Sequence, residues 1–326
     1  MKVLITGGAG FLGSHLCDAF LARGDHVICL DSGSISKIRH NFENPNFTYV
    51  HDTILNEPMV DSLVAQADLV YHLAAVVGVE HYVADPYAVL NVNVNGTQIV
   101  LRAAYKYKKK VVFSSTSEVY GRNPKVPWSE DDDRVLGSTR IDRWCYSTSK
   151  AVGEHFCFAY HKLGLPVVVL RYFNVYGPRL DALDRGRVIT IFLGQALRNE
   201  PITVVGDGTQ TRCFTYVDDA IRATLEAGLR DEAVGEIINI GSRRETQIRE
   251  LAELIVRLSG SSSEIIFVPQ EDIYGRSYED VPRRVPDTTR MEQILGVRAE
   301  TPLEEGLRRT IEYFKSQPAG SASDRE

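Results

Sequence analysis

Residues 1–13 read MKVLITGGAGFLG, and this stretch decides the fold. Its first part, Lys2–Thr6, is a short apolar run of the kind that forms a buried β-strand. Four glycines follow within seven residues, and Phe11–Ala22 then has the apolar spacing of an amphipathic helix. The stretch therefore predicts a strand, a tight glycine-rich turn and a helix in direct succession.

The glycines have the spacing of a dinucleotide-binding turn. Gly7, Gly10 and Gly13 fit the pattern Gly-x-x-Gly-x-x-Gly, which lets the backbone approach a pyrophosphate while the helix N-terminus supplies N–H groups and a partial positive charge. Asp31 stands at the end of the next expected strand, directly after His26–Leu30, and lies 18 residues after Gly13. A carboxylate there can accept hydrogen bonds from both ribose hydroxyls and would repel a 2′-phosphate, so NAD is favoured over NADP.

Runs of Val, Ile and Leu alternate with helical patterns through the first half of the chain. Strands that are apolar on both faces and separated by helices are typical of a parallel sheet covered by helices on both sides. We therefore predict an α/β fold with a Rossmann-type doubly wound parallel sheet. Further strands are expected at Phe47–Val50, Leu69–His72, Lys110–Ser115 and Pro166–Arg171, and helices at Asn56–Ala67 and Thr97–Tyr107.

The regularity fades from about residue 175, where Gly, Asp, Arg and Thr become frequent in loops. We expect an NAD-binding Rossmann domain over residues 1–175 and a smaller, interleaved C-terminal α/β domain over residues 176–316 that binds the substrate. Strand-like Glu236–Ile240 predicts that residues of about 214–241 rejoin the first domain. The polar segment 317–326 is expected to be a disordered tail.

The composition is that of an ordinary globular protein, with 44 % hydrophobic and 25 % charged residues among 326. A net charge of −6 disfavours nucleic acid and anionic membranes as partners, and no apolar stretch is long enough to span a bilayer. Five scattered cysteines without a Cys-x-x-Cys motif predict neither disulfides nor a zinc site, and favour a cytoplasmic location. His15, His72 and His81 lack companions at metal-ligand spacing, so no metal is expected.

Tyr146 and Lys150 lie four residues apart, which on a helix places both side chains on one face. A free tyrosine, with a pKa of ~10, is a poor base at neutral pH. A neighbouring ammonium, joined by a nicotinamide cation, favours the phenolate. Such a phenolate could take the proton of a sugar hydroxyl while hydride leaves the same carbon for NAD. Following a dinucleotide motif, the pair predicts a redox site.

With these motifs, the chain resembles the extended short-chain dehydrogenase/reductases, in the NAD-dependent nucleotide-sugar epimerase/dehydratase superfamily. The resemblance runs from Met1 to about residue 316. Besides the glycine turn and the Tyr-x-x-x-Lys pair, it rests on Leu73-Ala74-Ala75, Asn93–Thr97, Arg171–Arg179 and Gly206–Arg212.

Within that superfamily, Ser115–Gly121, with the sequence STSEVYG, separates the members. Sugar 4-epimerases usually have a further small residue where Glu118 stands, whereas Thr-Ser-Glu is similar to UDP-glucuronate decarboxylases and to GDP-mannose 4,6-dehydratases. Tyr278–Arg284 and Gly177–Ile189 add to the likeness to decarboxylases. The resemblance to the UDP-xylose synthase type implies decarboxylation of UDP-glucuronate, through a 4-keto intermediate, to UDP-xylose or a UDP-4-keto-pentose.

The same resemblance implies roles for the candidate site residues. Tyr146 would be the redox base, oriented by Lys150 and Thr116, while Glu118 and Arg284 would manage the carboxylate and the proton on C5. The candidate catalytic residues are Thr116, Ser117, Glu118, Tyr146, Lys150 and Arg284. The candidate NAD contacts are Gly7, Gly10, Phe11, Leu12, Gly13, Asp31, Asp52, Thr53, Leu73, Ala74, Ala75, Asn93, Ser114, Tyr146 and Lys150. The candidate substrate contacts are Tyr82, Arg143, Asn174, Arg179, Arg187, Arg212 (at the nucleotide diphosphate) and Tyr278.

Three alternatives stay open. A UDP-glucuronate or UDP-hexose 4-epimerase would use the same Tyr146 cycle and keep all six carbons, and a nucleotide-sugar 4,6-dehydratase would use Glu118 to remove a proton from C5. A non-catalytic NAD-sensing regulator belongs to a different class, although a sensor needs no Tyr-Lys pair. By resemblance we also expect a homodimer, through a four-helix bundle of Thr97–Tyr107 and Cys145–Lys162 from each chain.

Overall fold

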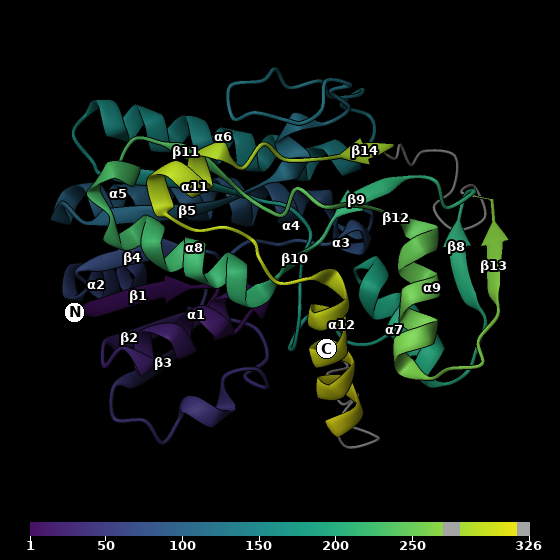
Figure 1. Cartoon of the computed structure of the whole chain (residues 1–326). Helices are drawn as coiled ribbons and strands as arrows, with labels where there is room; N and C mark the ends of the chain where they lie inside the picture. The colour runs from purple at the N-terminus through teal and green to yellow at the C-terminus, as the bar shows by residue number, and fades with distance from the viewer. Residues whose placement is uncertain (270–280, 318–326) are drawn as a thin grey trace.

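Seven parallel strands form the central sheet of the computed structural model, which describes residues 1–269 and 281–317 (Figure 1). The strand order is β11-β6-β5-β4-β1-β2-β3, and every neighbouring pair runs parallel. The strands are β1 (Lys2–Thr6), β2 (His26–Asp31), β3 (Phe47–His51), β4 (Leu69–His72), β5 (Lys110–Thr116), β6 (Val167–Tyr172) and β11 (Ile237–Ile240). This arrangement confirms the predicted doubly wound sheet, and β11 confirms the strand predicted at Glu236–Ile240.

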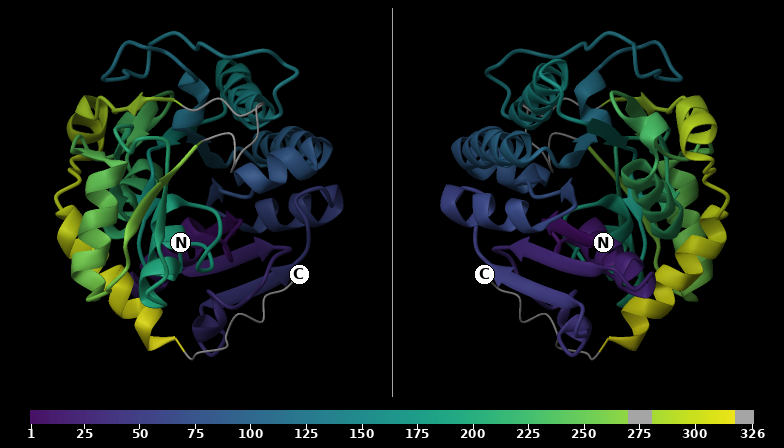
Figure 2. Two further views of the ribbon diagram at one scale, coloured as in Figure 1. Left: turned by 90° about the vertical axis from the view of Figure 1, so that its right-hand side faces the viewer. Right: turned by 90° about the vertical axis from the view of Figure 1, so that its left-hand side faces the viewer.

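Helices cover both faces of the sheet (Figure 2). Because successive residues of a strand point to opposite faces, Leu4 of β1 packs in one apolar cluster and its neighbours Val3 and Ile5 pack in another. The first cluster includes side chains of α2 (Glu57–Gln66), α5 (Thr97–Tyr107) and α6 (Arg143–Lys162). The second includes side chains of α1 (Phe11–Ala22), α8 (Val217–Leu229) and α11 (Thr289–Leu295).

The strand order reverses beside β1, which has β2 on one side and β4 on the other. Successive crossovers therefore leave β1 and β4 in opposite directions, and this opens a crevice at the carboxyl ends of the strands. The glycine turn follows β1 at this crevice. The segments after β4 are α3 (Val79–Ala84), α4 (Pro86–Leu90) and the π-helical turn η2 (Asn91–Gly96).

The later part of the chain forms smaller sheets beside the crevice. β8 and β13 pair in parallel, β12 and β14 flank β9, and β7 pairs with β10. Their bounds, and those of the helices between them, are β7 (Val175–Tyr176), α7 (Val188–Leu197), β8 (Ile202–Val205), β9 (Thr211–Cys213), β10 (Thr215–Tyr216), β12 (Glu245–Gln247), α9 (Ile248–Ser259), β13 (Ile265–Val268), β14 (Arg283–Arg284) and α12 (Leu303–Ser316). Residues 318–326 of the predicted tail lie outside the described part of the chain.

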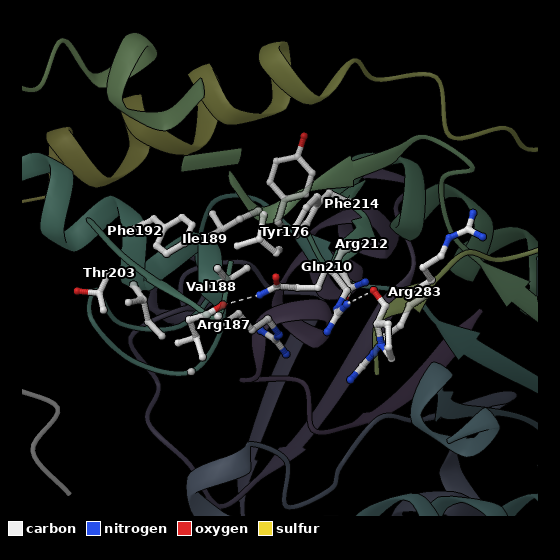
Figure 3. Close-up of a pocket in the computed structure, with 18 of the residues that line it drawn as sticks. Tyr176, Arg187, Val188, Ile189, Phe192, Thr203, Gln210, Arg212, Phe214 and Arg283 are labelled. Atoms are coloured by element: carbon white, nitrogen blue, oxygen red, sulfur yellow. Dashed lines mark hydrogen bonds between the residues drawn. The ribbon is translucent and has the colours of Figure 1, made fainter. Parts of the chain in front are cut away.

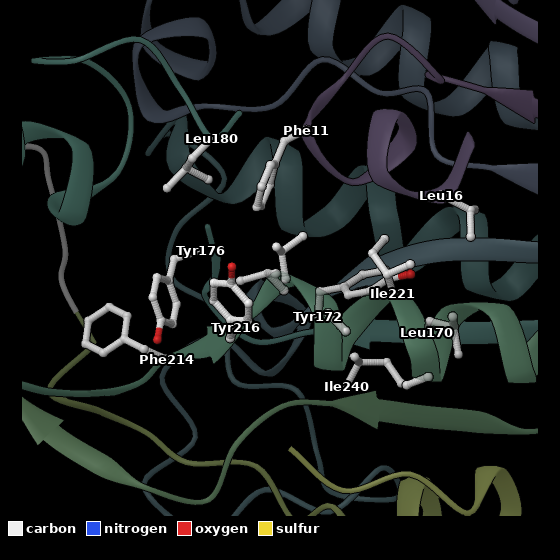
Figure 4. Close-up of a cluster of buried hydrophobic side chains, with 14 of the residues drawn as sticks. Phe11, Leu16, Leu170, Tyr172, Tyr176, Leu180, Phe214, Tyr216, Ile221 and Ile240 are labelled. Atoms are coloured by element: carbon white, nitrogen blue, oxygen red, sulfur yellow. The ribbon is translucent and has the colours of Figure 1, made fainter. Parts of the chain in front are cut away.

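One apolar cluster joins the two parts of the molecule (Figure 4). Phe11 and Leu170, from the sheet side, belong to the same cluster as Leu180 and Phe214 of the later part. The ring of Tyr176 lies 6.3 Å from that of Phe214, measured between ring centroids. The domain limits predicted from the sequence remain a prediction, since the core does not divide at residue 175.

Two absences concern the described residues alone. Within residues 1–269 and 281–317, no helix has both the length and the apolar character needed to cross a membrane. Over the same ranges, no group of His, Cys, Asp or Glu side chains is arranged to bind a metal ion.

Candidate active site

The glycine turn leaves no room for side chains. Gly7 has a φ of +74°, and a Cβ added there would lie 2.5 Å from the backbone nitrogen of Ala74, in the loop after β4. A Cβ on Gly13 would lie 2.1 Å from the carbonyl oxygen of Gly7. The start of α1 therefore packs directly on the turn, with its first N–H groups beside the crevice, as a pyrophosphate site requires.

Asp31 is oriented by the turns on either side of it. Its carboxylate accepts hydrogen bonds from the backbone N–H of Ala9 at 2.9 Å and from that of Gly33 at 2.8 Å. The N–H of Asp52, just beyond β3, donates to the carbonyl oxygen of Asp31 at 3.2 Å, and Thr53 follows in the same turn. A carboxylate and an anion-binding turn at one sheet edge form a donor and acceptor set that fits NAD.

Asn93 supports the loop that contains Leu73, Ala74 and Ala75. Its amide oxygen accepts from the N–H of Val76 at 2.8 Å, and its amide nitrogen donates to Ser149 Oγ of α6 at 3.1 Å. Asn93 therefore connects the loop after β4 to α6 through hydrogen bonds.

Tyr146 and Lys150 lie on the face of α6 that packs against the end of β5. Lys150 Nζ donates to the carbonyl oxygen of Ser114 at 2.8 Å. The Tyr146 phenol interacts with the hydroxyl of Thr116. The rings of Tyr82 and Tyr146 stack with their centroids 4.9 Å apart and their planes 8° from parallel. Thr116 and Tyr82, two of the predicted residues, thus contact Tyr146, the candidate base.

Burial is the largest influence on the pKa values of Tyr146 and Lys150. Burial raises the pKa of Tyr146 well above its usual range, as does the nearby charge of Glu118, while the Arg187 charge and the Thr116 hydrogen bond oppose them. Burial also lowers the pKa of Lys150 to about 8, against the influence of Cys157 and Glu154. The phenol of the protein alone therefore keeps its proton at neutral pH, and ionisation depends on charge brought by bound molecules.

Glu118 is fixed between two arginines. It lies in η3 (Ser117–Tyr120), where Thr116 Oγ1 accepts a hydrogen bond from the Glu118 N–H at 3.2 Å. Arg143 Nη2 lies 3.2 Å from Glu118 Oε2, and Arg284 makes a close ion pair with Oε1. Burial alone would raise the pKa of Glu118, but the two guanidinium charges outweigh it and hold the pKa at about 2. Its carboxylate is therefore ionised throughout the neutral range.

A cavity of 720 Å³ extends from Glu118 into the later part of the chain (Figure 3). Apolar side chains such as Phe192 lie toward one end, and Arg187 and Arg212 point into its middle. The predicted site residues that line it are Glu118, Arg143, Asn174, Arg187, Arg212 and Arg284. Cationic side chains spaced along a cavity of this size suit an elongated anionic ligand.

Arg187 links this cavity to the cofactor turn. Its guanidinium lies 5.8 Å from the ring centroid of Phe11, the first residue of α1, and Nη1 pairs with Asp181 Oδ1 at 3.1 Å. Arg212 Nη1 donates to its neighbour's carbonyl oxygen, that of Thr211, at 2.8 Å. Both arginines therefore have a defined direction before any ligand binds.

Arg179 packs against α1 and is not among the described residues that line the cavity. Its guanidinium donates to Asp18 Oδ2 and His15 Nδ1 of α1, both at 2.7 Å, and to the carbonyl oxygen of Lys37 at 3.2 Å. Its role as a substrate contact stays a prediction.

The remaining predicted residues are placed as follows. Ser117 is buried at the start of η3, and it is not among the described residues that line the cavity. Leu12, next to Phe11 in α1, packs against the apolar core. Tyr278 lies outside the described part of the chain.

The sequence reasoning missed two side chains. Ser147 Oγ donates to the carbonyl oxygen of Glu118 at 2.7 Å and so ties η3 to α6. Asp181 orients Arg187, as described above. The only sequence signal for Ser147 is its place directly after Tyr146, which does not distinguish it from any other helical serine.

Known proteins share this architecture. The NAD dependent epimerase/dehydratase family matches residues 3–241 of the chain. The chain belongs to this family. Its cofactor is therefore NAD, which confirms the prediction from the glycine turn and Asp31, while the individual NAD contacts stay predictions.

Within the epimerase/dehydratase family, two curated relatives are decarboxylases. A UDP-N-acetyl-alpha-D-glucosaminuronate decarboxylase of Bacillus cytotoxicus is 43 % identical over 315 residues, which are 96 % of this chain and 98 % of that protein. UDP-glucuronic acid decarboxylase 1 of Xenopus tropicalis is 36 % identical over 323 residues, which are 97 % of this chain and 72 % of that protein.

Solved structures of the family are similar as well. The UDP-glucuronic acid 4-epimerase of Bacillus cereus, in complex with UDP-glucuronic acid and NAD, superposes with a TM-score of 0.86 at 34 % identity, covering 97 % of this chain and 99 % of that one. The similarity therefore extends to decarboxylases and to a 4-epimerase, both named for UDP-uronates.

Proposed function

We propose that the protein is an NAD-dependent decarboxylase of a UDP-linked uronate, UDP-glucuronate or its 2-acetamido counterpart. The observation that carries the proposal is the ionised Glu118 between Arg143 and Arg284, at the end of the cavity nearest to Tyr146. The proposal is supported by the 43 % and 36 % identical decarboxylases.

The reaction begins at C4 of the sugar. Tyr146, oriented by Thr116, takes the proton of the C4 hydroxyl as hydride leaves C4. NAD, held by the glycine turn and Asp31, would supply the acceptor for that hydride. The Lys150 ammonium would favour the phenolate of Tyr146, and the nicotinamide cation would supply further positive charge. The product of this step is a 4-keto sugar whose C6 carboxylate lies β to the new carbonyl.

Decarboxylation follows from that geometry. The C5–C6 bond breaks, carbon dioxide leaves, and its electron pair forms the enolate of C4 and C5. Arg284 and Arg143 offset the charge of the substrate carboxylate beside Glu118. A proton taken from solvent water then adds to C5 of the enolate and completes the 4-keto-pentose. Return of hydride to C4, with the proton from Tyr146, would give the UDP-pentose.

The distal part of the cavity is proposed to bind the nucleotide. Arg212 lies where a diphosphate between uridine and sugar would pass, and Arg187 lies between it and the cofactor turn. We propose Asn174, which lines the cavity and whose amide donates to the carbonyl oxygen of Cys213 at 3.2 Å, as a contact of the sugar. We also retain Tyr82, stacked on Tyr146, as a sugar contact.

The C2 substituent of the sugar distinguishes the two candidate substrates. The more similar of the two decarboxylases above is named for an N-acetylated uronate and the other for UDP-glucuronate. Because the 43 % identical relative is named for the N-acetylated uronate, we propose that substrate as a candidate beside UDP-glucuronate.

Parallel incubations test the proposal. The protein, with NAD, is given UDP-glucuronate, UDP-N-acetylglucosaminuronate or UDP-glucose, and released carbon dioxide is measured. Carbon dioxide from at least one uronate and none from UDP-glucose is expected. A six-carbon 4-epimer without carbon dioxide would instead establish the epimerase alternative, which the solved UDP-glucuronic acid 4-epimerase supports.

We further propose a homodimer in the cytoplasm. The side chains of Tyr105 on α5 and Leu90 on α4 are 43 % and 40 % exposed, on the α5 and α6 side of the molecule, and a second copy would cover them. All five cysteines are free thiols, which supports a reducing compartment.

A further inference from the structure

A carboxylate and a guanidinium are buried together behind the catalytic face of α6. Glu154 follows Lys150 by one helical turn, so Tyr146, Lys150 and Glu154 share one face of the helix. Arg171 of β6 binds Glu154 through two bonds, from Nε to Oε1 at 2.9 Å and from Nη2 to Oε2 at 2.7 Å. The two side chains are 6 % and 8 % exposed. The proposed reaction makes no use of this pair.

Glu154 ties the helix to the strand that ends at the site. Its Oε1 also accepts a hydrogen bond from Ser115 Oγ at 2.5 Å. Ser115 stands between Ser114, which accepts from Lys150, and Thr116, which faces Tyr146. The last three residues of β5 are thus bound to α6 at points one turn apart. A displacement of Glu154 would move the strand end relative to the base.

Arg171 cannot easily leave this position. In addition to Glu154, its Nη1 donates to the carbonyl oxygen of Glu130 at 2.9 Å, and its guanidinium lies 4.7 Å from the ring centroid of Tyr120 in η3. The Tyr120 hydroxyl in turn donates to Asn239 of β11 at 2.7 Å. The ion pair is therefore held by the turn that contains Glu118 and by the neighbouring strand.

The side chains around Lys150 come from three elements. On its own helix Lys150 interacts with Glu154 and Cys157, and on β4 it interacts with His72. From β5 the ring centroid of Phe113 lies 5.0 Å from Nζ. Glu154 is the carboxylate among these groups, and it opposes the lowering of the Lys150 pKa by burial.

We propose that Glu154, held by Arg171, is a positioning residue for the Tyr146–Lys150 pair. It fixes the end of β5 against α6 and is the buried carboxylate one helical turn from Lys150. This role of Glu154 rests on the proposed function, because it serves the proposed hydride transfer. The titration that tests the role needs no turnover.

A titration of Lys150 tests the proposal directly. Protein labelled with ¹³C at lysine Cε is titrated by NMR in the presence of NAD, and the Lys150 signal is assigned by its loss in Lys150→Met. In Glu154→Gln the midpoint is expected to fall by about one pH unit, because the charge is lost at unchanged size. The control is Asp219→Asn, which removes the charge of another buried carboxylate that pairs with an arginine, the exposed Arg222 on α8, and should leave the midpoint unchanged.

A second variant covers the case in which Glu154→Gln does not fold, since it leaves Arg171 buried without its counter-charge. The double variant Glu154→Gln/Arg171→Met removes both charges, and a smaller fall of the midpoint in the same direction is expected. A Lys150 midpoint equal to that of the wild type, in either folded variant, overturns the proposal.

Turnover gives a separate readout. With a substrate that the wild type converts, Glu154→Gln should lower kcat about tenfold with KM unchanged, and the loss of activity at high pH should begin at lower pH. If the wild type converts no UDP-uronate, the proposed function fails, while the NMR titration still decides the role of Glu154.

Discussion

Glu118 keeps its charge at every pH at which the enzyme would be assayed. Two guanidinium groups hold its pKa at about 2, so it cannot act as a proton donor in the neutral range unless substrate displaces an arginine. In the proposed mechanism, the reaction therefore uses the negative charge of Glu118 and its fixed position between the two arginines. In Glu118→Gln we expect NAD affinity to be unchanged and release of carbon dioxide to be about 100-fold slower or more.

Carbon dioxide release in single turnover, together with NAD binding by calorimetry, checks this prediction. The matched control is Glu226→Gln, which breaks a glutamate–arginine pair of 2.7 Å on α8, and it should leave both quantities unchanged. Wild-type turnover in Glu118→Gln would remove Glu118 from the mechanism.

Single residues also show the limit of prediction from sequence. Spacing alone placed Tyr146 and Lys150 on one helical face, because the helical period determines it. It could not show which way Arg179 points, since its partner Asp18 lies 161 residues earlier in the chain. Nor could it show Ser147, whose contact with Glu118 joins two segments 29 residues apart.

At the scale of elements, the close packing of α1 on the glycine turn predicts the effect of one methyl group. In Gly13→Ala the new Cβ would lie 2.1 Å from the carbonyl oxygen of Gly7, so the turn or the helix must shift. We expect NAD affinity to fall at least about tenfold, a loss of about 1.4 kcal/mol. Calorimetric titration with NAD measures it.

Gly24→Ala is the control for that experiment. Gly24 has a φ of +82° and open space around its Cα, so alanine there should cost about 1–2 kcal/mol of stability and leave NAD affinity as it is. Equal NAD affinity in the two variants would contradict the account of the turn.

His72 connects two strands and a helix and makes their stability depend on pH. Its ring bonds with Thr6 Oγ1 of β1 at 2.8 Å and with Thr97 Oγ1 of α5 at 2.9 Å. Burial, together with the Lys150 charge, lowers its pKa to about 3. Below about pH 6.5, His72 of the unfolded chain binds a proton, whereas His72 of the folded chain stays neutral. The unfolding free energy therefore falls as the pH falls toward 3.

This contribution is about 1.4 kcal/mol per pH unit between those limits. Urea unfolding of the wild type and of His72→Gln, at pH 6.5 and 4.5, measures it. The variant should lose about 2 kcal/mol less than the wild type over that interval. Equal losses would show that His72 is not the buried neutral group described here.

The elements of the central sheet were predictable to within one residue, whereas the short strands were not. Strands such as β1, β4 and β6 are apolar runs followed or preceded by a helix in sequence, and both of their faces are buried. The edge strand β3 is only partly buried. β9, by contrast, has three residues and pairs with β12 and β14, which lie far along the chain. Such short strands form only by pairing with distant strands, so no local sequence pattern predicts them.

At the scale of the whole molecule, the exposed Tyr105 of α5 predicts the oligomeric state. We expect light scattering after gel filtration to give twice the mass of one chain. Tyr105→Glu, on α5, should shift the protein toward monomer, because it places a charge where apolar surface would be buried. Phe267→Glu changes a similarly exposed side chain on β13, at the other end of the molecule in Figure 1, and should leave the dimer intact.

A monomeric wild type at assay concentration would contradict the dimer.

The predicted domain limits, which remain a prediction, cross one continuous apolar core. Leu180 and Phe214 of the later part share one apolar cluster with Phe11 and Leu170, and these contacts form only when the whole chain is folded (Figure 4).

The most direct test of the decarboxylase proposal follows the carbon atoms of the substrate. UDP-glucuronate, uniformly ¹³C-labelled in its sugar, is incubated with the protein and NAD, alongside UDP-N-acetylglucosaminuronate labelled in the same way, and ¹³C NMR spectra are recorded over time. The account predicts that the C6 carboxylate signal is replaced by carbon dioxide or bicarbonate while a five-carbon UDP-sugar, or its 4-ketone, appears. A UDP-galacturonate-type product that retains all six carbons, with no labelled bicarbonate, would contradict it.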